Sequence, residues 1–238
     1  MSNEPLRILA VGAHPDDIEF GCGGILLAEA TRGSVISLCI CSRGEAGTNG
    51  KPDEREAEAR KAAKLLEATL EFVDFGGDCH LEISPQNRIA IARQIRVARP
   101  EVLLAPTVEP DQHPDHAITG RLCRDAVRLA RYGGLEEICD LAPHTVRHHL
   151  EYAVTPGAEP PNEGCKIVVD ITAQFDRWVE LMECHATQLR TRRYVELQTS
   201  RSRVLGLAVG VEHAQAVFST SDWTIRNLSE LPGSLRLF

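Results

Sequence analysis

Ala13-His14-Pro15-Asp16-Asp17-Ile18-Glu19 follows directly on the apolar run Leu6 to Val11. The run is bounded by Pro5 and Gly12, which is typical of a short strand buried on both faces. A strand that ends at Gly12 delivers one imidazole and two adjacent carboxylates into a tight loop before a helix. Metals in proteins use these ligand types, and a spare carboxylate beside a metal can serve as a base.

A second group of the same chemical type is His113-Pro114-Asp115-His116. It follows another apolar run, Glu101 to Pro106, and precedes a helical pattern. Between the two groups, strand-like runs at 35–41 and 70–75 alternate with helical patterns. The sequence therefore predicts a β-α-β-α-β-α-β-α order.

This order predicts an α/β fold with a Rossmann-like, doubly wound and mainly parallel sheet. In the common strand order 3-2-1-4-5, strands one and four are neighbours where the winding reverses, and ligands bind at their carboxyl ends. The two histidine groups follow these two strands. We therefore expect the groups to meet in one site.

The remainder of the chain is less regular. Apolar patterns predict strands at 148–154, 167–169 and 214–218, and helices around 175–182 and over 194–209, with an exposed turn at 158–164. We expect one domain over residues 1–238, with a Rossmann-like core at 1–130. Residues 131–238 are expected to form an extension that walls the site.

The composition is that of an ordinary globular protein, with 43% hydrophobic and 25% charged residues. The net charge of -8 argues against a nucleic-acid binder, which needs clustered basic residues. The amino terminus lacks a basic segment, and the first apolar run is too short for a membrane span, so we expect a cytoplasmic protein without membrane contact. Eight cysteines without a Cys-x-x-Cys pair predict reduced, mostly buried thiols.

Catalytic zinc takes three protein ligands and leaves a position for water, and His14, Asp17 and His116 supply such a set. Asp16 then lies beside the metal and is free to act as a base toward the attacking water. A two-histidine, one-aspartate set with open positions also accepts iron or cobalt. The constellation suits hydrolysis of an amide.

The residues of the second group suit supporting roles. Protonated His113 is a candidate hydrogen-bond donor to the oxyanion of a tetrahedral intermediate. Asp115 is placed to hold the second nitrogen of one imidazole, as histidines at metal sites usually require. Either group alone is also consistent with a capped helix start, and only their predicted proximity favours a metal site.

These two groups resemble the signature motifs of the LmbE-like (PIG-L) N-acetylglucosaminyl deacetylases. The resemblance implies a Rossmann-like fold and zinc-dependent removal of acetyl from an amino sugar. It also implies zinc ligands at His14, Asp17 and His116, a general base and later acid at Asp16, and an oxyanion donor at His113. A substrate-binding role is implied for Arg55, and a homo-oligomer, a hexamer, for the assembly.

Weaker similarity continues at 143–146 and 211–218, most like the branch that deacetylates N-acetylglucosaminyl-malate in bacillithiol synthesis. The candidates for binding an anionic aglycone are Arg43, Arg55 and Arg147. Glu45 is a candidate for orienting one of these arginines. Exposed arginines are more often solvated charges. Two alternatives remain open: a deacetylase of another amino-sugar amide, such as an antibiotic intermediate or chitin fragment, and a non-catalytic Rossmann-like module that binds a sugar or nucleotide.

Overall fold

The computed structural model describes residues 4–160 and 165–227, and within them the strands form one seven-stranded sheet. The strand order is β3-β2-β1-β4-β5-β7-β6. The first five strands are parallel, and β7 runs antiparallel to both β5 and β6. The expected mainly parallel, doubly wound sheet is confirmed. The strands are β1 (Arg7–Gly12), β2 (Val35–Ile40), β3 (Thr69–Phe72), β4 (Val102–Pro106), β5 (His148–Tyr152), β6 (Cys165–Asp170) and β7 (Ala214–Ser219).

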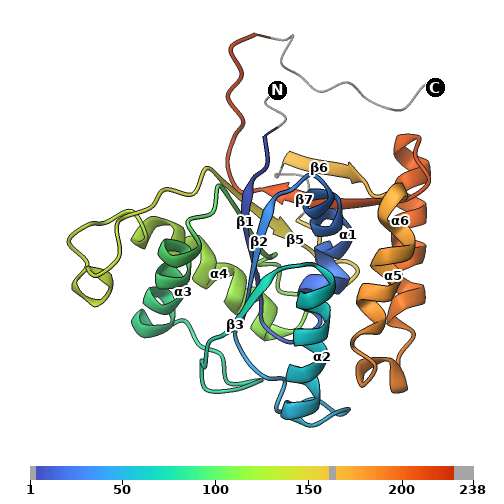
Figure 1. Ribbon diagram of the computed structural model, residues 1–238, viewed down its shortest axis with the longest axis horizontal. Helices are drawn as coiled ribbons and strands as arrows, with labels where there is room; N and C mark the ends of the chain where they lie inside the picture. Colours follow the sequence, from blue (N-terminus) through green and yellow to red (C-terminus); the bar gives the residue numbers. More distant parts are fainter. Residues whose placement is uncertain (1–3, 161–164, 228–238) are drawn as a thin grey trace.

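Helices cover both faces of the sheet (Figure 1). The helices α3 and α4 lie on one face, and α1, α2, α5 and α6 lie on the other. Over the described residues, no helix combines the length and apolar content needed to cross a bilayer. The helices are α1 (Asp17–Thr31), α2 (Pro52–Leu65), α3 (Pro85–Ala98), α4 (Pro114–Leu129), α5 (Phe175–Glu183) and α6 (Tyr194–Val209), with 3-10 turns η1 (Glu136–Ile138), η2 (Thr172–Gln174) and η3 (Gln188–Arg190).

The central strands are apolar on both sides because both helix layers pack on them. On β1, Ile8 and Ala10 face the cluster under α1, whereas Leu9 and Val11 face the cluster under α3 and α4. All four side chains are at most 3% exposed. This burial explains why β1 reads as a continuous apolar run and not as an alternating one.

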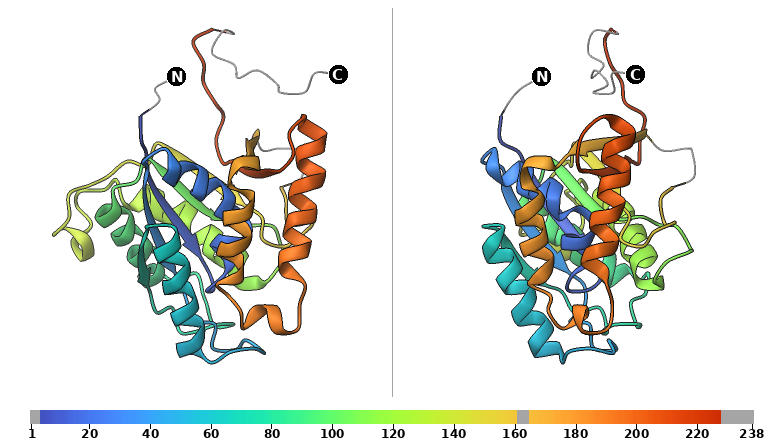
Figure 2. Two further views of the ribbon diagram at one scale, coloured as in Figure 1. Left: turned by 45° about the vertical axis from the view of Figure 1, so that its right-hand side comes forward. Right: turned by 90° about the vertical axis from the view of Figure 1, so that its right-hand side faces the viewer.

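Residues 131–238 do more than wall the site, because they contribute three strands to the sheet. Helix α5 packs on α1, and α6 stands beside α5 (Figure 2). Tyr152 from β5 sits so close to α1 that a Cβ on Gly21 would lie 2.2 Å from its Cδ2 atom. The Tyr152 hydroxyl donates to the Val11 carbonyl at 2.8 Å, which fixes the ring. The expected turn at 158–164 lies partly outside the described residues.

The site is positioned where β1 and β4 end side by side. Helix α1 leaves β1 toward one face of the sheet and α4 leaves β4 toward the other, so the two connecting loops meet at the carboxyl edge. Each loop carries one of the two histidine groups.

Candidate metal and catalytic site

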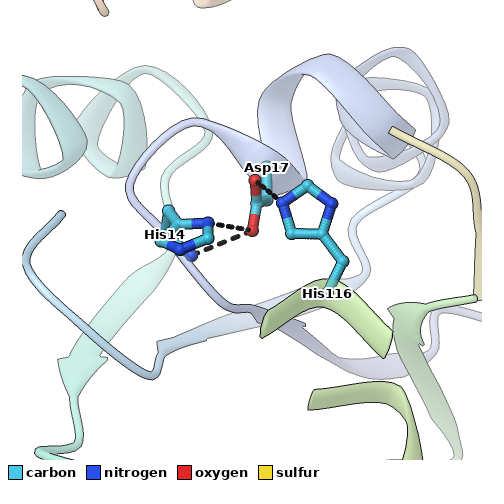
Figure 3. Close-up of side chains that lie close together, drawn as sticks. All are labelled: His14, Asp17 and His116. Atoms are coloured by element: carbon cyan, nitrogen blue, oxygen red, sulfur yellow. Dashed lines mark hydrogen bonds and ion pairs between the residues drawn. The ribbon is translucent and has the colours of Figure 1, made fainter. Parts of the chain in front are cut away.

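Asp17 is held in place by the backbone that precedes it. Its Oδ2 atom accepts the N–H groups of Ala13 and His14, each at 2.9 Å. The other oxygen, Oδ1, lies 3.0 Å from Nε2 of His116. Figure 3 shows His14 and His116 approaching this carboxylate from two sides. The chain itself therefore brings together the two loops that the sequence predicted to meet.

The ligand atoms of His14, Asp17 and His116 all lie within 4.8 Å of one another, and the three residues are buried. Nδ1 of His14 is 3.5 Å from Asp17 Oδ2. Its other nitrogen, Nε2, is 2.9 Å from Asp78 Oδ1 and 3.3 Å from Asp115 Oδ2. Carboxylates that hold one nitrogen leave the other for a cation, as at known histidine metal sites. The three donors fit a divalent cation such as zinc and leave coordination positions for water or substrate.

The electrostatics of these residues also favour a cation. Burial alone would lower the pKa of His14, but the carboxylates of Asp17, Asp115 and Asp78 raise it well above its ordinary value. Burial would raise the pKa of Asp17, but His116 and His14 lower it well below its ordinary value. The carboxylates around His14 and His116 thus stabilise a positive charge at the donor set.

Asp16 occupies the N-cap position of α1, yet its side chain makes no capping hydrogen bond. Its φ of 114° and ψ of -28° lie in the left-handed region, which is unusual for a residue other than glycine. The side chain lines the site cavity, with Oδ1 3.6 Å from Nη2 of Arg55. Burial raises the pKa of Asp16 to about 6, against the lowering effect of Arg55. Asp16 is therefore a carboxylate close to the donor set that is not used for capping.

His113 is the N-cap of α4, and its Nδ1 accepts the N–H of Asp115 at 3.3 Å. In the neutral ring the proton is therefore on Nε2. Burial and the neighbouring His14 and His116 lower the pKa of His113. We expected a protonated His113, but its surroundings favour a neutral imidazole that still offers an N–H group.

Arg55 and Glu45 have structural partners. Arg55 is buried in α2 and donates to the carbonyls of Gly44 at 3.1 Å and Pro15 at 2.8 Å, so it ties two loops to this helix beside Asp16. Glu45 was expected to orient an arginine, but its Oε2 accepts the backbone N–H of Asp78 at 2.9 Å.

The other two arginines expected to bind substrate do not line the cavity. The half-buried Arg43 pairs with Asp53 and Glu56. The Arg147 N–H donates to the Glu101 carbonyl, beside the amino ends of β4 and β5. The placement of both residues argues against the expected substrate role. Arg43 is paired outside the cavity, and Arg147 is at the edge of the sheet opposite the site.

Sequence reasoning missed Asp78 and Cys79, which follow β3 and line the cavity. Asp78 was detectable in principle, because β3 was a predicted strand whose carboxyl end lies at the same edge of the sheet. Burial would raise the pKa of Asp78, but His14 lowers it to about 2. Asp78 thus stays ionised beside His14.

The cavity has a volume of about 520 Å³. Its floor contains the donor set, Asp16 and Arg55, and the carboxyl-terminal extension supplies one wall that includes Gln188, Arg192, Tyr194 and Gln198. The extension thus walls the cavity. Within the described part of the chain, the exposed Arg192 makes no ion pair, so it offers a free positive charge at the rim.

Known proteins share this fold and parts of this sequence. The chain is 28% identical over 158 residues to a diacetylchitobiose deacetylase from Thermococcus kodakarensis, a match that covers 61% of this chain and 59% of that enzyme. It is 27% identical over 207 residues to 4-oxalmesaconate hydratase from Pseudomonas putida, covering 79% and 76%. The solved structure of a conserved protein from Thermus thermophilus has a TM-score of 0.80 at 29% identity, covering 96% of this chain and 100% of that chain.

A family model described as GlcNAc-PI de-N-acetylase matches residues 9–127. This segment is half of the 238 residues and contains both histidine groups together with Asp16, Arg55 and Asp78. The family match, the mainly parallel sheet and the geometry at the ends of β1 and β4 agree. The chain therefore belongs to the PIG-L family.

Proposed function

We propose that this protein is a metal-dependent N-deacetylase that hydrolyses the acetyl amide of an N-acetylglucosamine conjugate. The observation that carries this proposal is a carboxylate that lines the cavity beside a buried cation site and does not cap its helix. Asp16 lies next to the His14, Asp17 and His116 donors, and makes no capping bond. A purely structural metal site has no use for such a base, which argues against a non-catalytic binding module.

In the proposed reaction, a divalent ion held by His14, Asp17 and His116 supplies polarisation of the acetyl carbonyl and acidification of water. Asp16 takes a proton from the attacking water as its oxygen bonds to the carbonyl carbon. The Nε2–H of His113 donates to the oxyanion of the tetrahedral intermediate. Asp16 then returns the proton to the sugar nitrogen as the C–N bond breaks, which leaves acetate and a free amine.

The substrate we propose is N-acetylglucosaminyl-malate, as in bacillithiol synthesis. The free charge of Arg192 at the cavity rim supports an anionic aglycone, and a guanidinium matches a carboxylate in shape. Zinc is the proposed metal, with iron or cobalt as substitutes. A cytoplasmic homo-oligomer, a hexamer by family resemblance, stays a prediction.

The test is release of free amine from a panel of N-acetylglucosamine conjugates. The panel contains the malate conjugate, a neutral methyl glycoside and diacetylchitobiose, each with zinc-loaded and with chelator-treated enzyme. We expect metal-dependent release and a preference for the malate conjugate that Arg192→Gln weakens. Preference for the neutral sugars would contradict the proposed malate aglycone but would still support the deacetylase reaction.

A hydratase is the second candidate, because the relative matched over 79% of this chain adds water to an unsaturated acid according to its name. The same base is suited to activate water for addition to a double bond. Loss of the ultraviolet absorbance of 4-oxalmesaconate, without amine release from any sugar, would select this candidate.

Asp16→Asn provides the residue-level test of the reaction. Removal of the base is expected to lower turnover by about 10²-fold or more. The bound metal, measured by elemental analysis, should stay at the wild-type level because Asp16 is not a ligand. Asp176→Asn, an exposed aspartate on α5, is the matched control and should keep full activity. Full turnover in Asp16→Asn would remove Asp16 from the reaction.

A further inference from the structure

A second cluster of ligand-type side chains lies on the far side of His14 from Asp17. The Cys79 sulfur is 3.4 Å from Asp78 Oδ1 and 3.8 Å from Nε2 of His113. In the neighbouring group of His14, Asp78 and His113, one ligand atom of each residue lies within 4.8 Å of the other two. Asp78, Cys79 and His113 all line the cavity, and Cys79 is exposed to it. The cluster is therefore open to a small ion from solvent.

These distances agree with the bond lengths of zinc. With Zn–S of about 2.3 Å and Zn–N or Zn–O of about 2.1 Å, ligand atoms at tetrahedral angles lie about 3.6 Å apart. The two sulfur distances of 3.4 and 3.8 Å bracket that value. A thiolate, an imidazole and a carboxylate together favour zinc or cobalt over magnesium or calcium.

We propose that Asp78, Cys79 and His113 form a second site for a thiophilic divalent cation such as zinc, adjacent to the first site. His14 separates the two, because Nδ1 faces Asp17 and Nε2 faces Asp78. A cation at the second site occupies the nitrogen of His113 that would otherwise donate to the oxyanion. Excess zinc therefore inhibits turnover. This consequence rests on the proposed deacetylase function, whereas the binding does not.

The protons balance without a further reactant. The Cys79 thiol loses its proton to solvent as the sulfur binds the cation. The ring proton of His113 moves from Nε2 to Nδ1, which gives up the long 3.3 Å contact with the Asp115 N–H. Asp78 contacts His14 and Cys79 through Oδ1, and its Oδ2 atom takes part in neither contact.

The experiment uses the full chain loaded with one equivalent of zinc and titrated with Co²⁺. The first site contains no sulfur, so a thiolate-to-cobalt charge-transfer band reports the second site alone. We expect the band in the wild type and in the control Cys139→Ala, whose cysteine is also exposed but is not among the cavity-lining residues. Cys79→Ala should lose the band and bind one cation instead of two.

Inhibition is measured in parallel. Excess zinc should lower wild-type turnover by about tenfold or more and that of Cys79→Ala by less than about twofold, because the proposed site needs its thiolate. Differential alkylation of the wild type provides a measurement that does not depend on a variant: zinc beyond one equivalent should slow alkylation of Cys79 and not of Cys139. A thiolate band that persists in Cys79→Ala, or unprotected Cys79 in the wild type, overturns the site whether or not the enzyme proves to be a deacetylase.

Discussion

The backbone of Asp16 is in a strained conformation, and this conformation determines where its carboxylate points. A left-handed conformation costs a residue other than glycine about 1–3 kcal/mol and persists only where the surroundings impose it. Here the tight turn between β1 and α1 imposes it. In exchange the side chain is directed into the cavity and not onto the N–H groups of α1. Asp16 thus occupies the N-cap position of α1 but does not make the hydrogen bond of an N-cap residue.

Arg55 is expected to set the pH at which Asp16 becomes a base. Its charge lowers the pKa of Asp16, which is about 6 with Arg55 in place. Arg55→Gln removes the charge, so the pKa of Asp16 rises and its carboxyl group stays protonated up to a higher pH. The acid limb of the kcat/KM profile should move up by about one pH unit. Arg43→Gln, in the loop that precedes α2 and outside the cavity, should leave the limb in place, and an equal shift in both variants would contradict this role.

Much of the site could be predicted at the level of single residues. The donors and Asp16 follow two strands that the common order makes neighbours, so their meeting required only topology. Asp78 and Cys79 were missed because one aspartate and one cysteine after a Gly-Gly pair carry no motif. Arg192 was missed because its place at the rim depends on where α6 packs, which local sequence does not specify.

The contact between α1 and β5 is expected to be intolerant of any added side chain. Gly21→Ala should improve intrinsic helix propensity by up to about 1 kcal/mol. The new Cβ would however lie 2.2 Å from a Tyr152 ring that its hydroxyl bond holds fixed. Overpacking should win and lower the free energy of unfolding by about 1–3 kcal/mol, measured by urea unfolding. Gly134→Ala, with no atom within 4 Å of its Cβ, should be neutral.

The elements themselves were predictable where apolar periodicity is strong. The alternation up to α4 and the span of α6 agree with the structure. The partners of β6 and β7 were not predictable. The helices α5 and α6 separate these two strands in sequence, and an apolar run does not indicate which strand it pairs with. The placement of Arg147 was unknown for the same reason. Its distance from the site depends on β5 joining β4 in parallel.

The stability of the whole molecule should fall on acidification through His149. Burial first, and then Arg124, lowers the pKa of this residue on β5 to about 4. The unfolded chain takes up that proton near pH 6.5, so the contribution of a neutral His149 is complete above pH 6.5 and is lost as the pH falls toward 4. At pH 5 the loss should be about 1–2 kcal/mol. Urea unfolding at pH 7 and 5 should show a smaller loss for His149→Gln, and an equal loss would contradict the assignment.

The Rossmann-like core at 1–130 should not fold alone, although its sequence pattern looks self-contained. The core cluster under α1 includes Tyr152, Trp178, Leu181 and Val217, all from the extension. A fragment of residues 1–130 exposes that apolar face and also leaves β4 as an open edge. We expect it to bind a hydrophobic dye and to unfold without cooperativity. A cooperative urea transition in the fragment would show that the extension is dispensable.

The way Asp17 is anchored bears on how this protein matures in the cell. Its carboxylate is fixed by two backbone N–H groups, so the pocket for the ion is built by the chain and not by the ion. Small zinc modules, in contrast, acquire their shape only on loading. Newly made chains should therefore finish folding empty and receive their ion afterwards. Which ion each molecule carries then depends on which metals are available at that moment, because raw affinity follows one general order of the divalent metals and does not by itself select the ion that a protein uses.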